Sequence, residues 1–411
     1  MKILQLCKKF PYPLKDGESI AVNSISKSLH ELDCEVTLLA MNTIKHYFDI
    51  NNLPNNYNHY ENIHTVSIDN RVKPLAAFLN LFSKKSYHIA RFESAAFRKQ
   101  LIQLLQTKEF DLIQLESPYL APYIPTIRQY SKAKIAMRSH NVEHEIWQRV
   151  TENTRFLPKK WYLNHLTKKL QRYEIEQLKN YDLLVAITQR DLNKLQFLGY
   201  NNAAVVAPVG VNSTDYPSHF KSFDTALSLG FIGSLDWMPN QEGLRWFLDN
   251  VWSKLSNYFP TLTFHIAGRN APPWLQQLQL KNVVFHGEVP DAPLFINQHS
   301  IMVVPLFSGS GMRVKIVEGM ALGRVVVTTS MGLEGIDAHH GQEVLIADTA
   351  ESFIKAITLC QNDITFARQI SVQARNFVLQ QYDNQAIASQ LVQAYAQLLP
   401  TASEALQLLE V

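Results

Sequence analysis

The chain has 411 residues, enough for two or three domains, and its hydrophobic and charged fractions of 46% and 18% exclude a disordered or fibrous protein. The net charge of +3 is unevenly divided. Residues 1–200 contain 28 Lys and Arg against 19 Asp and Glu, a charge of +9, whereas residues 201–411 contain 11 against 17, a charge of −6. A basic half of this kind indicates an anionic partner such as nucleic acid or a lipid surface, although solvated helix faces alone can also produce it.

Several classes of protein are disfavoured by simple absences. The three cysteines are widely separated, without a C-x-x-C motif or clustered histidines, which argues against a disulfide framework and a zinc site. No stretch has the roughly 18 apolar residues of a membrane-spanning helix, and the chain begins on a strand-like run instead of a signal peptide. We therefore expect a cytoplasmic protein.

The first half alternates short apolar runs with segments of helical period, beginning with a βα unit whose helix is expected from about Glu18 to Leu32. Continuous apolar strands are typical of a parallel sheet that is covered on both faces. The expected strands are Ile3–Cys7, Glu35–Ala40, His64–Ile68, Asp111–Leu115, Lys134–Ser139, Leu183–Ile187 and Ala204–Ala207.

The second half repeats this pattern, and its last two helices are expected over 363–382 and 385–399. The expected strands are Leu229–Ile232, Leu262–Ala267, Val283–Phe285, Ile301–Pro305, Val325–Thr328 and Val344–Ile346. A segment rich in Pro, Gly and polar residues separates the halves. We expect two Rossmann-like, doubly wound α/β domains, 1–207 and 208–383, followed by a C-terminal helix, 384–411, that can pack back on the first domain.

Two segments of the first half are irregular. Residues 51–60 form a polar, asparagine-rich loop. Residues 156–172 are basic, with aromatic and leucine residues at helical spacing. A packed helix with its lysines in water is the simpler interpretation of 156–172, and a membrane-surface helix is the alternative. Peripheral contact with an anionic membrane is therefore a hypothesis, and no nucleic-acid partner is expected.

A glycine loop that opens a helix follows the expected strand 301–305. Gly309 and Gly311 permit close approach of the backbone, and Ser310 can cap the helix. The free N–H groups and the dipole of such a helix favour a phosphate. Arg313 falls on the apolar face of the helix, so we expect its side chain to reach past the helix N-terminus toward an anion.

Two further charged residues, Lys315 and Glu318, are spaced i, i+3 on the same helix. Their simplest interpretation is a surface ion pair. The run 308–320 also resembles the donor-binding motif of the retaining, nucleotide-sugar-dependent family-4 (group 1) glycosyltransferases of the GT-B fold. The resemblance implies that Glu318 binds the ribose hydroxyls. The family's first motif glutamate is replaced by Ser310, as in a branch with the variant G-S-G-x-R-x-K.

The resemblance extends over nearly the whole chain and implies roles for other residues. Gly17 resembles the glycine of the family's first loop, between strand and helix. His140 resembles the histidine near the transferred sugar, although a locally bonded strand-end histidine is an equal alternative, and Asn141 beside it is an acceptor candidate. Gly233 resembles the start of the second domain, but the arginine and lysine usual after it are absent.

The missing phosphate cations need replacements elsewhere. Arg313 and Lys315 are the first candidates, and Arg269, after strand 262–267, is a weaker third. Glu116 follows a strand of the first domain, and its position predicts contact with the acceptor at the edge where such sheets bind ligands.

The resemblance thus implies a metal-independent, retaining hexosyltransferase in which two domains face each other across a cleft. It would use a nucleoside diphosphate sugar, UDP- or GDP-linked, as donor, with no tightly bound cofactor. The acceptor would be a glycan, a lipid-linked species or a small molecule, in polysaccharide or glycoconjugate biosynthesis. Two alternatives stay open: a non-hydrolysing nucleotide-sugar epimerase of the same fold, and a non-catalytic GT-B partner subunit.

Overall fold

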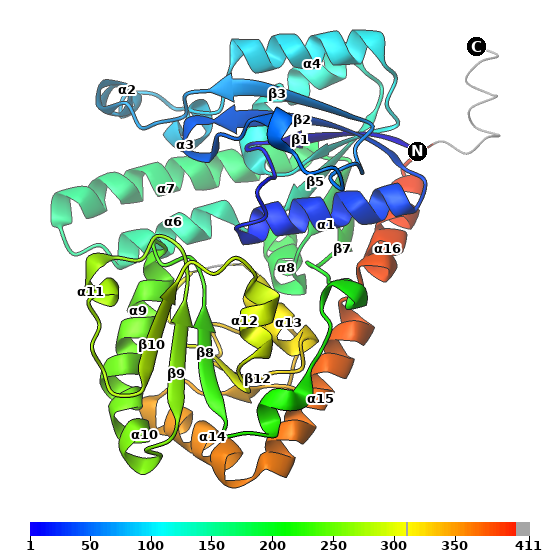
Figure 1. The fold of residues 1–411 in the computed structure, drawn as a ribbon. Coiled ribbons are helices and arrows are strands. Elements are labelled where there is room, and N and C mark those ends of the chain that lie inside the picture. Colours follow the sequence, from blue (N-terminus) through cyan, green and yellow to red (C-terminus); the bar gives the residue numbers. More distant parts are fainter. Residues whose placement is uncertain (310, 400–411) are drawn as a thin grey trace. The chain divides into compact units, whose positions relative to one another are not determined.

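The computed structural model describes residues 1–309 and 311–399, and the chain divides into two compact units. The first unit contains residues 1–208 and 385–399, and the second contains residues 209–384. Both units are parallel sheets with helices between the strands (Figure 1). The expected class, a pair of doubly wound α/β sheets, is confirmed.

The first unit has a seven-stranded sheet in the order β3-β2-β1-β4-β5-β6-β7. Its strands are β1 (Lys2–Cys7), β2 (Glu35–Thr43), β3 (Asn62–Ile68), β4 (Leu112–Leu115), β5 (Lys134–Ser139), β6 (Leu183–Ala186) and β7 (Ala203–Val206). Its helices are α1 (Gly17–Glu31), α2 (Pro74–Asn80), α3 (Tyr87–Ala90), α4 (Ala95–Thr107), α5 (Ile124–Tyr130), α6 (Glu143–Glu152), α7 (Leu157–Gln177), α8 (Gln189–Phe197) and α16 (Asn384–Ala396).

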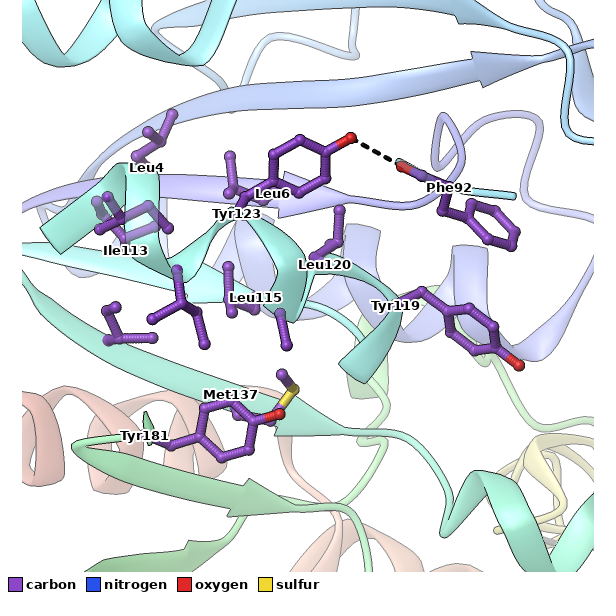
Figure 2. Close-up of a cluster of buried hydrophobic side chains, with 14 of the residues drawn as sticks. Leu4, Leu6, Phe92, Ile113, Leu115, Tyr119, Leu120, Tyr123, Met137 and Tyr181 are labelled. Carbon is purple, nitrogen blue, oxygen red and sulfur yellow. Dashed lines mark hydrogen bonds between the residues drawn. The ribbon is translucent and has the colours of Figure 1, made fainter. Parts of the chain in front are cut away.

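Each face of this sheet has its own core. Leu4 and Leu6 of β1 belong to one hydrophobic cluster, whereas Ile3 and Cys7 belong to the cluster on the other face. Figure 2 shows the first cluster, in which the Tyr123 hydroxyl donates a 2.7 Å hydrogen bond to the carbonyl of Phe92. The alternation follows from the two-residue period of a strand and explains why these strands are apolar throughout.

The C-terminal helix α16 belongs to the second of these cores. Its side chains at positions 387, 388, 391 and 395 are buried in the cluster that contains Ile3 and Cys7. This spacing gives α16 one apolar face, and that face packs on the first unit.

The second unit has a six-stranded sheet in the order β10-β9-β8-β11-β12-β13. Its strands are β8 (Ser228–Ile232), β9 (Thr263–Ala267), β10 (Val283–Gly287), β11 (Ile301–Val304), β12 (Val325–Thr328) and β13 (Leu345–Ile346). Its helices are α9 (Met238–Phe247), α10 (Ser253–Tyr258), α11 (Pro273–Gln276), α12 (Ala292–Asn297), α13 (Val314–Ala321), α14 (Ala350–Asn362) and α15 (Ile364–Gln381).

In each sheet the strand order reverses at one point. This point lies between β1 and β4 in the first unit and between β8 and β11 in the second. Open α/β sheets bind ligands at the carboxyl ends of the strands beside such a point. Within the described ranges, no helix combines the length and the apolar character needed to cross a membrane.

Candidate functional site

The glycine loop lies at the switch point of the second unit, between β11 and α13. Gly309 and Gly311 have φ angles of +105° and +79°, in the left-handed region that favours glycine. A Cβ atom on Gly309 would stand 3.1 Å from the Trp237 ring and 3.2 Å from Nη2 of Arg313. The loop therefore passes so close to both side chains that a larger residue would crowd them. Ser310, the expected cap, lies outside the described residues.

Arg313 is buried at the N-cap of α13 and belongs to this loop. Its Nη1 donates to the carbonyl of Gly311, and its guanidinium lies 6.0 Å from the centre of the Trp237 ring. As expected, the side chain is directed to the helix N-terminus and not into the apolar face, which Ile316 and Met320 fill. Arg313 therefore holds the conformation of the loop through these contacts, a structural role that was not expected from the sequence.

Lys315 lies in the first turn of α13 and reaches the end of β8. Its Nζ donates to Oδ1 of Asn240 at 2.8 Å and lies 4.7 Å from the centre of the Phe231 ring. A Cβ atom on Gly233 would stand 2.8 Å from Nδ2 of Asn240 and 3.4 Å from this Nζ, so glycine leaves room for the amide that holds the amine. Burial, together with the positive charge of Arg313, lowers the pKa of Lys315 to about 7.

Glu318 lies one turn further along α13. It accepts a 2.9 Å hydrogen bond from the hydroxyl of Tyr216, which precedes β8, and burial raises the pKa of the carboxyl. Because Lys315 bonds to Asn240 and Glu318 to Tyr216, the expected surface ion pair between Lys315 and Glu318 is wrong. Both side chains are instead part-buried, with separate partners.

Arg269 follows β9, the neighbour of β8. Its Nε donates a 2.8 Å hydrogen bond to Oγ of Ser234, which in turn donates to Asp236 at 2.9 Å. Arg269 therefore folds over the turn that follows Gly233, at the same edge of the sheet as Lys315.

In the first unit, Glu116 and His140 lie at the ends of the neighbouring strands β4 and β5. Oε2 of Glu116 is 2.8 Å from Nε2 of His140 and 3.4 Å from Nη1 of Arg138. Burial alone would raise the pKa of Glu116, but the charge of Arg138 and the hydrogen bond from His140 lower it to about 2. The first unit thus contains an ionised carboxylate, that of Glu116, in contact with the ring of His140.

The expected role of Glu116 as an acceptor contact is wrong in this structure. Its side chain is fully buried, and its other oxygen accepts from Gln5 at 2.5 Å and from Gln114. The hydroxyl of Tyr395, on α16, donates to Gln114. Glu116 is in contact with His140, whose side chain keeps 10% of its surface exposed.

The remaining expected residues of the first unit lie beside His140 and at the start of α1. Asn141 follows His140, and its carbonyl accepts a 2.9 Å hydrogen bond from Oγ of Ser139. Gly17 is the first residue of α1, which is capped by Asp16 through the amide of Ser19 at 3.0 Å.

Residues that the sequence analysis did not single out complete both sites. In the first unit, Lys8 and Lys9 follow β1. Lys8 lies 3.5 Å from Glu18, and Lys9 pairs with Asp16 at 2.6 Å. In the second unit, the residues that were not singled out are Trp237, Asn240 and Tyr216. No local motif marks these residues, although Lys8 and Lys9 could have been found from their position directly after the first strand.

Across residues 1–309 and 311–399, no three His, Cys, Asp or Glu side chains gather closely enough to hold a metal ion.

Sequence comparison assigns a family to part of the second unit. Residues 226–363 match the family model described as Glycosyl transferases group 1. A protein of Klebsiella pneumoniae, described as an uncharacterized 44.6 kDa protein in cps region, is 22% identical over 306 residues, which is 72% of this chain and 76% of that protein.

Solved structures resemble the whole chain. Sucrose-phosphate synthase from Thermosynechococcus elongatus is 14% identical with a TM-score of 0.73, over 97% of this chain and 99% of that chain. Anabaena HepE in complex with UDP is 16% identical with a TM-score of 0.68, over 97% and 100%. Its complex with UDP-glucose is 15% identical with a TM-score of 0.66, over 97% and 100%. The chain therefore has the GT-B fold.

Proposed function

We propose that this protein transfers a sugar from a nucleoside diphosphate sugar, UDP- or GDP-linked, to an acceptor with retention of configuration. The observation that carries the proposal is the position of Lys315. Its amine lies beside Gly233 at the switch point of the unit that matches the group 1 family, where an α/β sheet binds its ligand. The HepE complexes with UDP and UDP-glucose support this class of donor, and retention rests on the motif resemblance.

The second unit is proposed to bind the donor. Lys315 and the N–H groups at the start of α13 would bind the diphosphate, with Gly309 and Gly311 allowing its close approach. Arg313 would hold the loop and add positive charge, while Arg269 is a further candidate for the phosphates. Glu318, positioned by the hydroxyl of Tyr216, would accept hydrogen bonds from the ribose.

The chemical step is proposed to depend on electrostatic stabilisation. Negative charge grows on the departing diphosphate, and cations already held in place stabilise this charge without reorganising. In the first unit, the buried Glu116 fixes Nε2 of His140, so the ring would be presented to the transferred sugar in one orientation. Asn141 and the loop before Gly17 are candidates for the acceptor side.

The donor can be identified by a thermal-shift screen of the full chain with UDP, GDP, ADP and their sugars. A ligand at 100 times its Kd stabilises the folded state by roughly 2.7 kcal/mol. With the donor known, NMR of the product would show whether the anomeric configuration is retained. Inversion would refute retention, and a chain that binds none of these nucleotides would refute the assignment of the site. The epimerase and non-catalytic alternatives are not favoured by the comparisons.

A further inference from the structure

Helix α2 exposes an apolar stripe. Leu75, Phe78, Leu79 and Phe82 are spaced i, i+3, i+4, i+7, so they lie on one face of α2 and the turn after it. Leu75 is 72% exposed and Phe82 is 81% exposed, and the rings of Phe78 and Phe82 contact each other at 5.8 Å. Large contiguous apolar surfaces are rare on monomeric proteins and mark interaction sites.

The exposure is imposed by the fold, because the opposite side of α2 is anchored. Ala77 packs against Tyr87 of α3 and Leu166 of α7. Nζ of Lys169, also on α7, donates to the carbonyl of Asn80 at 2.6 Å, which fixes the end of α2. The stripe therefore cannot turn inward without breaking these contacts.

The start of α7 extends this apolar surface. Phe156, Leu157 and Trp161 are exposed, with Trp161 at 64%, whereas Leu163 and Leu166 further along are buried. Figure 1 shows α2 and the first turns of α7 on the same side of the first unit. The packed-helix interpretation of 156–172 thus holds for the later turns of α7, and the first turn presents apolar side chains to solvent.

The charges within the two segments that carry this surface are of one sign. The segments 71–85 and 155–172 contain ten Lys and Arg and no Asp or Glu. Lys84, Lys159 and Lys168 are exposed, while Arg71 pairs with Asp69 and Lys85 lies 3.8 Å from Glu93. A second copy docked through the same surface would bring like charges together, whereas an anionic lipid surface complements them.

We infer that the surface formed by residues 72–82 and 156–161 docks on an anionic lipid bilayer. The apolar side chains enter the boundary between headgroups and acyl chains, and the surrounding lysines contact lipid phosphates. A lipid-linked acceptor would then be met at the membrane, but the docking itself does not depend on the proposed activity.

Flotation of the full chain with vesicles tests this inference. Vesicles of phosphatidylcholine with about 30 mol% phosphatidylglycerol should bind the chain at low salt, and pure phosphatidylcholine should bind it far less. Binding should weaken at 0.5 M NaCl, where the Debye length is only about 4 Å. The fluorescence of Trp161 should shift to the blue on binding.

Variants separate the two contributions. The double variant Phe78→Ser/Phe82→Ser should lower the partition coefficient at least about tenfold. Lys84→Gln/Lys159→Gln should lower it roughly fivefold per lysine, and only on anionic vesicles. Phe197→Ser is the matched control, because Phe197 is 86% exposed at the end of α8, outside the surface. These positions are exposed, so we expect unchanged thermal unfolding.

Three results would overturn the inference. The first is the absence of vesicle binding at low salt, and the second is an equal loss of vesicle binding in Phe197→Ser. The third is a dimer that forms without lipid and that dissociates in Phe78→Ser/Phe82→Ser. The last result would assign the surface to contact between copies of the chain. None of them bears on donor binding, which the thermal-shift screen measures in the absence of lipid.

Discussion

The affinity for a nucleoside diphosphate should depend on pH through Lys315. Its pKa of about 7 means that the amine is about half protonated at pH 7 in the free protein. A bound diphosphate favours the ammonium form, so its pKa rises in the complex and binding takes up a proton. The protonated fraction falls to about 3% at pH 8.5, so the Kd for UDP should rise about 16-fold between pH 7 and pH 8.5. The second ionisation of the nucleotide phosphate, near pH 6, lies below this window.

Calorimetric titration in two buffers of different ionisation enthalpy measures both the affinity and the proton uptake. Lys315→Met should bind UDP weakly, with no pH dependence between 7 and 8.5. Lys281→Met, which removes an exposed lysine of the same unit, should keep the wild-type profile. An unchanged wild-type Kd across this range, or the same slope in Lys315→Met, would show that the amine does not contact the diphosphate.

Substitutions at three further residues test the proposed roles. Arg313→Ala should lower kcat about 10²- to 10³-fold and raise the donor KM less, with Arg313→Lys also impaired, and steady-state kinetics with normal turnover would contradict this. Glu318→Ala should weaken UDP binding by about 1.5 to 3 kcal/mol without loss of fold, whereas an unchanged Kd would remove the ribose role. Glu116→Ala leaves Arg138 buried without its counter-charge and should cost about 3 to 5 kcal/mol in urea unfolding. Glu116→Gln also removes the charge, so an unchanged free energy of unfolding in both variants would argue against this charge pairing.

The elements of the fold could be predicted because their signals are local. Strands such as Leu183–Ala186 are continuous apolar runs, and the helices between them show a regular period. The predicted helix over 363–382 is observed as Ile364–Gln381, with Asp363 as its cap. The order of the strands in each sheet is not a local property, so the reversals between β1 and β4 and between β8 and β11 were not predicted from the sequence.

The environment of the site residues could not be predicted because their partners are distant in the chain. Glu318 and Tyr216 are 102 residues apart, and Lys315 and Asn240 are 75 apart. The i, i+3 spacing of Lys315 and Glu318 suggested a local pair, but tertiary contacts gave each side chain another partner. The burial of Glu116 was missed for the same reason, since a polar residue at a strand end is equally compatible with a binding edge.

The absence of the usual cations after Gly233 can be understood from these contacts. The amine of Lys315 lies beside Gly233, and Asn240, whose Nδ2 would stand 2.8 Å from a Cβ atom on Gly233, holds the amine from the first turn of α9. A positive charge is thus brought to the end of β8 from α13 without a basic residue in the turn itself. Burial also lowers the pKa of this amine to about 7, so the proposed binding of phosphate by Lys315 would be sensitive to pH in a way that binding by a solvent-exposed arginine would not.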